Sequence, residues 1–296
     1  MRLLVTGGSG FLGGYVLAEA ARRGHETVAL ARSDTAARTV ARHGAQPLSG
    51  DLDDAARLPA LFGAARCDAL VNLASLGFGH APAIAAAARA AGLDRAVFVS
   101  TTAVTTTLPA RSKRIRLDAE QRIRESGLKW TVLRPTMIYG APGDRNLARL
   151  LTLLPLVPLL PVPGGGHQLQ QPVHVADVAD AVLSAAERPA AAGHSYDVAG
   201  PQPLSFADLL RTCAQAVGSR IRLVPVPLAP LVIAARGYER LSAQPRIRAE
   251  QLQRLAEDKV FAIGEAARDL GYAPRPFADG ILAEARALGL ARRSRP

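Results

Sequence analysis

The chain contains little cysteine, and this shortage limits its chemistry first. Its two cysteines, Cys67 and Cys213, lie far apart in apolar surroundings. Two isolated thiols exclude a disulfide framework and a cysteine-rich zinc site, so no metal site is expected. A glycine-rich motif begins at residue 7, which leaves no room for an N-terminal signal peptide. We therefore expect a reduced, cytoplasmic protein.

Long hydrophobic runs are also missing. The two most apolar stretches, 147–163 and 223–235, contain several prolines. Both fall short of the ~20 apolar residues that are needed to span a bilayer. We expect no membrane span, and we interpret both stretches as buried or pocket-lining segments.

Aromatic residues make up only 4% of the chain, although its formal net charge is +11. Proteins that bind nucleic acids interleave basic side chains with stacking aromatic rings. The densest basic stretch, 111–124, instead alternates with acidic residues such as Asp118 and Glu120. We expect a solvated helix face beside an anionic cofactor, and no nucleic-acid partner.

What the first half does contain is a regular alternation of short apolar runs and helical stretches, which predicts a doubly wound parallel sheet of the Rossmann type. We predict a dinucleotide-binding core over 1–140. The rest, 141–296, should add sheet elements at about 167–200 and a small, mostly helical substrate lobe. Glycines at 24 and 92 should end helices, and Asp53 should cap one. The predicted strands are 2–6, 27–31, 45–49, 69–74, 96–100 and 130–133, and the predicted helices are 11–23, 55–64, 82–91 and 113–126.

The most informative segment is the glycine-rich loop at 6–13, which follows an apolar strand and opens a helix. Gly7 allows a tight turn, Gly10 lets the backbone approach a pyrophosphate, and Gly13 permits close helix–strand packing. The helix N-terminus offers unpaired N–H groups and partial positive charge to the phosphates. The alternative is a tight turn without a ligand. The predicted cofactor contacts here are Gly7, Ser9, Gly10, Phe11, Leu12 and Gly13.

The end of the second strand discriminates between the two nicotinamide cofactors. NAD sites usually place an acidic residue there, which binds the ribose 2′-hydroxyl. This strand ends with Arg32 and Ser33, and the nearest acid, Asp34, lies further into the loop. Arg32 and Ser33 are suited to a 2′-phosphate, so NADP(H) is favoured over NAD(H). The alternative is a solvent-exposed loop arginine.

With these residues, the sequence resembles the short-chain dehydrogenase/reductase superfamily, in its extended and atypical branch. That branch is epimerase/dehydratase-like and includes the NAD(P)-binding accessory subunit of respiratory complex I. The resemblance covers about residues 1–200 and rests on the segments 6–13, 50–52, 72–75, 99–102, 134–140 and 171–179. It implies that Asp51 and Leu52 border the adenine and that Pro135 lies near the nicotinamide. It also implies that Leu73, Ala74 and Ser75 line the ribose and phosphates, with core packing as the alternative for each.

The chain departs from this family at its catalytic helix. Catalytic members carry a Tyr-x-x-x-Lys pair, in which the lysine lowers the tyrosine pKa for proton exchange with the substrate. This chain has no tyrosine between Tyr15 and Tyr139. Ser112 stands at the tyrosine position and Arg116 at the lysine position. A serine hydroxyl is too weak an acid to replace tyrosine, so the proton-transfer machinery is missing or rebuilt.

Other polar side chains near the expected site are candidates for the chemistry. Ser100, Thr101 and Thr102 are predicted to orient a substrate carbonyl, although a hydroxyl-rich strand end is the alternative. Lys113 and Arg116 share a helix face. Lys113 is predicted to bind the nicotinamide ribose, with facing water as the alternative. His80, Arg116 and Tyr139 are the candidate substrate contacts, and Tyr139 and His174 also have structural interpretations.

The sequence therefore predicts an NAD(P)-dependent oxidoreductase or epimerase-like enzyme with a modified active site. A lipophilic or quinone-like small metabolite fits the leucine- and proline-rich segments, as in secondary-metabolite tailoring. The alternative is a non-catalytic NAD(P)-binding sensor or structural module that contacts a protein partner. A closed apolar pocket over the nicotinamide favours the enzyme, and a flat exposed apolar surface favours the module.

Overall fold

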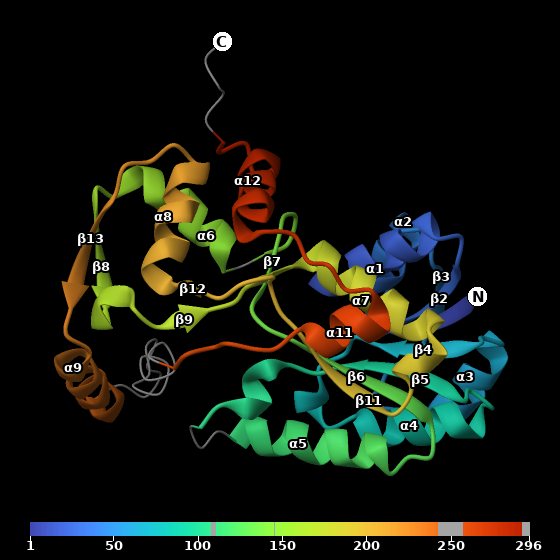
Figure 1. Cartoon of the computed structure of the whole chain (residues 1–296). Helices are drawn as coiled ribbons and strands as arrows, with labels where there is room; N and C mark the ends of the chain where they lie inside the picture. The colour runs from blue at the N-terminus through green and yellow to red at the C-terminus, as the bar shows by residue number, and fades with distance from the viewer. Residues whose placement is uncertain (108–110, 145, 242–256, 292–296) are drawn as a thin grey trace.

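A seven-stranded parallel sheet forms the centre of the computed structural model, which describes residues 1–107, 111–144, 146–241 and 257–291 (Figure 1). Every neighbouring pair of its strands is parallel. This confirms the predicted Rossmann-type α/β fold. In spatial order the strands are β3 (Gln46–Ser49), β2 (Glu26–Ala31), β1 (Arg2–Thr6), β4 (Ala69–Asn72), β5 (Arg95–Val99), β6 (Lys129–Pro135) and β11 (His194–Val198).

Helices cover both faces of this sheet, because alternate side chains of each strand point to opposite sides. Val5 packs with Leu17 and Val182 in one buried cluster, whereas Leu4 packs with Phe62 in another. The first cluster lies under α1 (Phe11–Arg22), α2 (Asp34–Arg42), α7 (Val175–Glu187) and α11 (Gly264–Leu270), and the second lies under α3 (Leu58–Ala65), α4 (Ala81–Ala90) and α5 (Arg111–Arg124).

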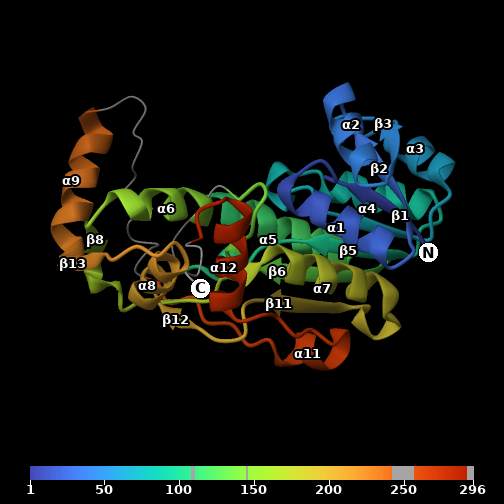
Figure 2. The ribbon, with the colours of Figure 1, turned by 90° about the horizontal axis from the view of Figure 1, so that it is seen from above.

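A smaller lobe lies at one end of the sheet (Figure 2). Leu151, Leu209 and Ile281 are among the side chains of its own buried cluster. Short strand pairs join it to the sheet: β7 (Ile138–Tyr139) with β10 (Val173–His174), and β9 (Leu169–Gln170) with β12 (Leu204–Ser205). The lobe contains α6 (Leu147–Leu153), β8 (Leu159–Pro163), α8 (Phe206–Ala216), β13 (Arg222–Val226), α9 (Leu228–Leu241) and α12 (Phe277–Ala287).

The interpretation of 147–163 and 223–235 as buried or pocket-lining segments is wrong in part. The structure pairs them with each other, as β8 and β13, in a separate two-stranded parallel sheet. Leu151 and Val162 are buried, but Leu156 is exposed. An isolated strand pair packs on one face, so the other large side chains remain in solvent. No helix in the described part of the chain is long and apolar enough to cross a membrane.

The predicted helix ends have mixed outcomes. Gly24 and Gly92 follow helices with left-handed φ values of +75° and +76°, as predicted. Asp53 caps no helix, because α3 begins at Leu58 and its N-cap residue makes no side-chain hydrogen bond. The Asp53 carboxylate oxygen Oδ1 instead lies 2.8 Å from Nε2 of His80.

A fully buried carboxylate joins α5 to the sheet. Glu120 accepts hydrogen bonds from Ser100 Oγ at 2.7 Å and from Arg134 Nε at 3.1 Å, and it also pairs with Arg124. Burial raises the pKa of Glu120, but the hydrogen bonds from Arg134 and Ser100 outweigh burial and bring it below its usual value. The carboxylate is therefore charged at neutral pH, and it fixes the end of β5 and β6 against α5.

We predict that Glu120→Ala lowers the free energy of unfolding by about 2–4 kcal/mol, because it leaves the half-buried Arg134 without its partner. Chemical denaturation measures the change. The matched control is Glu125→Ala, which removes an exposed carboxylate directly after the same helix and should change stability by no more than about 0.5 kcal/mol.

The pH dependence follows from the same pKa shift. Because the folded-state pKa of Glu120 is below the ordinary value of 4.5, its contribution is present above that value and is lost as the pH falls through the folded-state pKa. The stability gap between wild type and Glu120→Ala should therefore narrow in acid. A constant gap would contradict the assignment.

Candidate cofactor groove and active site

The glycine-rich loop lies directly against the loop that follows β4. Gly7 has φ +74°, and a Cβ placed on it would lie 2.6 Å from the backbone nitrogen of Ala74. A Cβ on Gly13 would lie 2.3 Å from the carbonyl oxygen of Gly8. Gly13 therefore packs on the loop itself, and not on a strand as predicted. Both positions require the absence of a side chain.

Two hydrogen bonds align the loops after β1 and β4. Thr6 Oγ1 donates to Asn72 Oδ1 at 2.6 Å, and Asn72 Nδ2 donates to the carbonyl oxygen of Ala74 at 3.0 Å. Gly10 precedes α1 and offers no side chain to its first N–H groups. The first turn of α1 therefore has donors for an anion, which a phosphate group fits.

A groove of about 370 Å³ opens beside these loops. It lies at the carboxyl ends of β1, β2, β3 and β4, and Arg32 brings a positive charge to it. Nine of the predicted cofactor residues line it: Gly7, Ser9, Gly10, Arg32, Asp51, Leu52, Leu73, Ala74 and Ser75. The residues present fit a dinucleotide, because helix N–H groups, an arginine and apolar walls converge here.

The remaining predicted cofactor residues lie outside this groove. Phe11 lines another cavity, of about 870 Å³, which shares Ser9 and Gly10 with the groove. Leu12 packs against the core cluster below α1. Ser33 is the N-cap of α2, where its Oγ accepts a hydrogen bond from Ala36 at 3.3 Å. The Ser33 oxygen is therefore engaged with α2, and Arg32 is the side chain at this strand end that faces the groove.

His80 lines the cofactor groove and not the pocket near Thr101. Its Nε2 pairs with Asp53 at the groove rim. His80 therefore lies beside the cofactor loops, and its substrate contact stays a prediction.

A second candidate pocket, of about 390 Å³, lies at the carboxyl ends of β5 and β6. Thr102 Oγ1 donates to the carbonyl oxygen of Pro135 at 3.3 Å. Thr101 Oγ1 accepts a hydrogen bond from Ala103 N at 3.2 Å, which leaves its own proton for another acceptor. The lining residues are Thr101, Thr102, Ala103, Thr105, Thr106, Thr107, Thr136, Met137, Glu257, Asp258, Lys259 and Phe261.

The pocket also contains a carboxylate that sequence reasoning missed. Glu257 accepts hydrogen bonds from the hydroxyls of Thr106 and Thr107, both at 2.6 Å, and from Thr107 N at 3.0 Å. Burial raises the Glu257 pKa, but the threonine hydrogen bonds outweigh burial and lower it. No local pattern marks Glu257, because its partners lie about 150 residues earlier in the chain.

Two residues that were predicted to contact the substrate make other contacts in the structure. Ser100 donates its hydroxyl proton to buried Glu120, so the hydroxyl is engaged in holding α5 and does not line the pocket. Tyr139 is 1% exposed, and its ring meets His174 and Phe277 edge-on at 5.3 and 5.2 Å. Burial raises the Tyr139 pKa. Packing therefore accounts for Tyr139 in this structure, and the substrate contact predicted for it stays a prediction.

His174 has the structural role that its sequence context indicated. Its Nδ1 accepts a hydrogen bond from Ala176 N at 3.2 Å and caps α7. Burial and the nearby Arg275 lower the pKa of His174 to about 4, so the ring is neutral at physiological pH. A neutral acceptor at the N-cap is what this helix end requires.

Ser112 and Arg116, which are expected at the positions of the family's tyrosine and lysine, both lie on α5. Ser112 lines neither the cofactor groove nor the threonine-lined pocket. Arg116 Nη1 donates to the Ser112 carbonyl at 3.3 Å, and a Cβ on Gly77 would lie 3.2 Å from Arg116 Nη2. Lys113 Nζ donates to the Thr106 carbonyl at 2.5 Å, which places this ammonium beside the threonine-lined pocket.

Comparison with known proteins adds relatives of known activity. Residues 7–189 match the family described as NAD(P)H-binding. A ketoreductase of 4-hydroxy-2-methyl-3-oxo-4-farnesyl-3,4-dihydroquinoline-1-oxide from Stigmatella aurantiaca is 32% identical over 93% of this chain and 92% of its own. The 2-alkyl-3-oxoalkanoate reductase of Stenotrophomonas maltophilia (strain K279a) is 29% identical over 93% of this chain and 95% of its own.

A solved structure supports the fold independently. The UDP-glucose 4-epimerase of Thermus thermophilus in complex with NAD matches with a TM-score of 0.74, covering 98% of this chain and 99% of that one. The two sequences are 20% identical, so this likeness concerns the fold.

We predict that replacing Gly10 with tryptophan abolishes dinucleotide binding while the protein stays folded. A Cβ at this position meets only the Gly7 carbonyl, at 3.3 Å, but an indole would occupy the space of the pyrophosphate. Titration calorimetry with NADH and NADPH measures the loss. The control is Gly63→Ala on α3, where a Cβ meets nothing within 4 Å and binding should not change. Failure of well-folded wild type to bind either cofactor would overturn the assignment of the groove.

Proposed function

The chain belongs to the NAD(P)H-binding family of extended short-chain dehydrogenases/reductases, and on this basis we propose that it reduces a carbonyl group of a lipophilic or quinone-like metabolite. One observation carries the proposal: a threonine-lined pocket opens on β5 and β6, beside the strands whose loops form the cofactor groove. Two relatives support the substrate class. Their names describe reductases of oxo compounds that carry a farnesyl or an alkyl chain.

We propose the following roles for the residues of the groove. The N-terminus of α1 holds the pyrophosphate, and Arg32 binds a 2′-phosphate, which favours NADP(H). Asp51 and Leu52 border the adenine, and Pro135 lies nearest the nicotinamide. When bound, the reduced cofactor supplies a hydride for a carbonyl carbon. Leu73, Ala74 and Ser75 then line the ribose and phosphates.

In the pocket, we propose that Thr101 orients the substrate. Its oxygen already accepts the Ala103 N–H, so its hydroxyl proton points to another acceptor, and a substrate carbonyl oxygen is suited to that position. As the carbonyl carbon is reduced, its oxygen takes up one proton. The proton comes from water, a substrate hydroxyl, or a relay through Thr101 and Thr102. Ser112 is outside this arrangement.

The alternative function is a non-catalytic binding module, and one observation favours it. The lobe exposes several large apolar side chains, among them Leu156 and Ile233. The threonine-lined pocket favours the enzyme, so activity measurements have to separate the two.

The proposed location is the cytoplasm. Cys67 and Cys213 are both free, and burial raises the pKa of each thiol. Protonated, partly or fully buried thiols are unreactive and fit a reducing compartment.

We predict that Arg32→Ala weakens NADP(H) binding by about 1.5–3 kcal/mol, the contribution of a charge-assisted hydrogen bond, and leaves NAD(H) binding nearly unchanged. Titration calorimetry with both cofactors measures the difference. Arg38→Ala is the matched control, since Arg38 is an exposed arginine of α2 outside the groove lining. Equal losses for both cofactors would show that Arg32 does not recognise the 2′-phosphate.

We predict that Thr101→Val lowers turnover by on the order of 10²- to 10⁴-fold, the contribution of a positioned proton-transfer group. Ser112→Ala should retain most activity. The assay follows cofactor absorbance and product mass with a prenylated or alkylated ketone. Loss of turnover in Ser112→Ala at unchanged cofactor affinity would show that the serine acts in the tyrosine's place. An absence of turnover combined with cofactor-dependent binding of a macromolecule would favour the module.

A further inference from the structure

One end of the lobe carries an exposed apolar surface built from β8, β13, α9 and the 3-10 turn before β8. Figures 1 and 2 both show these elements together, at the end of the molecule opposite α2 and α3. Leu156 is 75% exposed, Ile233 69%, Leu159 55% and Val224 39%. We call these four side chains and the arginines described next the lobe-tip surface. The described residues leave these four side chains largely in solvent, and an exposed apolar patch of this kind indicates a binding surface.

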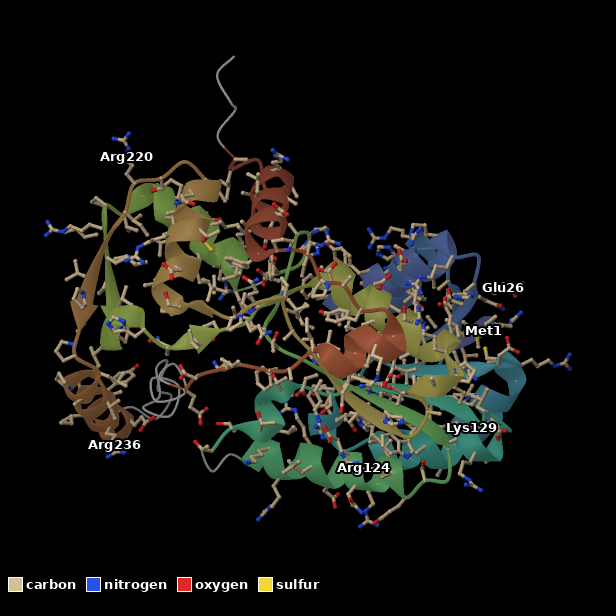
Figure 3. The ribbon with its side chains drawn as sticks, in the orientation of Figure 1. Met1, Glu26, Arg124, Lys129, Arg220 and Arg236 are labelled. Atoms are coloured by element: carbon tan, nitrogen blue, oxygen red, sulfur yellow. The ribbon has the colours of Figure 1, made fainter. Side chains whose placement is uncertain are left out.

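The segments 147–163 and 219–241, which contain these elements, carry positive charge with little negative charge. Arg149, Arg220, Arg222 and Arg236 are all exposed. In Figure 3 the labelled Arg220 and Arg236 project away from the ribbon near the two ends of the β13–α9 segment. Across segments 147–163 and 219–241 the sequence contains a single acidic residue, Glu239. Aliphatic and basic side chains therefore share one end of the lobe.

We propose that the lobe-tip surface binds the surface of an anionic lipid membrane. Leucine, isoleucine and valine side chains enter the boundary between headgroups and acyl chains, while arginines contact the lipid phosphates. This mode of binding needs no spanning helix. It stands on the exposure and charge of this surface, and it does not depend on the proposed reaction. For a lipophilic substrate it would bring the pocket close to the phase in which such a molecule dissolves.

The charge pattern argues against the two other occupants. A second copy would meet this surface through a two-fold axis, which places the arginine-rich patch of one copy against that of the other. A protein partner is usually held by buried aromatic anchors, and Tyr238 is the one aromatic residue within 147–163 and 219–241. An anionic lipid surface satisfies both the aliphatic and the basic side chains.

Sedimentation with lipid vesicles tests the proposal on the full chain. Wild type should bind phosphatidylcholine vesicles that contain phosphatidylglycerol and should bind phosphatidylcholine alone far more weakly, and added salt should release it. Arg222→Glu should weaken binding to the anionic vesicles at least fivefold, from a contribution of ~1 kcal/mol per basic residue near such a surface. The double variant Leu156→Ser with Ile233→Ser should weaken it about tenfold.

The control is Leu117→Ser, which removes an exposed leucine from α5 on the other part of the molecule and should leave vesicle binding unchanged. Cofactor titration and circular dichroism verify that each variant is folded. Equal binding to neutral and anionic vesicles, or no binding to either, overturns the proposal. Light scattering tests for a second copy on this surface. If the wild type is a dimer and the lobe-tip variants are monomers, the surface binds a second copy and the membrane proposal is overturned as well.

Discussion

The close approach of Gly7 to the backbone of Ala74 is the constraint on which the site depends. It occurs between the loops that follow β1 and β4, two neighbouring strands in the sheet. From β1 the sheet continues through β2 to β3, and from β4 it continues in the opposite direction to β11. At such a switch point the loops after neighbouring strands diverge and leave a crevice. The Thr6–Asn72 hydrogen bond holds the two strand ends in register below that crevice. A side chain at residue 7 would separate the loops and displace the groove walls.

Charged side chains of α5 hold this helix against the turn after β5 and against the sheet. Lys113 binds the Thr106 carbonyl, Arg116 binds the Ser112 carbonyl, and Glu120 is buried with Arg134 and Ser100. These groups position the helix and the threonine-rich turn after β5. In the proposed reaction, the threonine hydroxyls of that turn contact the substrate. Because hydroxyls are weak acids, turnover in the proposed site would depend on positioning and on an external proton more than on an activated side chain.

Local sequence patterns were sufficient for most of the sheet and for the glycine-rich loop, because each of these depends on a few adjacent residues. The strands from β1 to β6 and the turn at Gly7 belong to this group. Helix α2 was missed, because Val40 is its one buried residue and most of its side chains are polar.

Features that need partners distant in the chain could not be predicted. Glu257 joins the threonine-lined pocket from far along the sequence, and the Ser100 hydroxyl donates a hydrogen bond to a helix residue twenty positions later. The apolar stretches were recognised, but their composition does not reveal that β8 pairs with β13 and leaves one face exposed. Hydrophobic content alone does not distinguish a core strand from a surface strand.

The pairing of β8 with β13 also sets an order for biosynthesis. During translation, each strand from β2 to β6 emerges when one of its sheet neighbours has already been made. Strand β8 emerges after them without any partner, because β13 is not made until residues 222–226 have left the ribosome. The nascent chain therefore carries an unpaired, leucine- and proline-rich edge while some sixty codons are read, the period in which such an edge is most exposed to aggregation. The prolines in and beside β8, at 158, 161 and 163, lack the N–H donors that would let it pair with another chain in that interval.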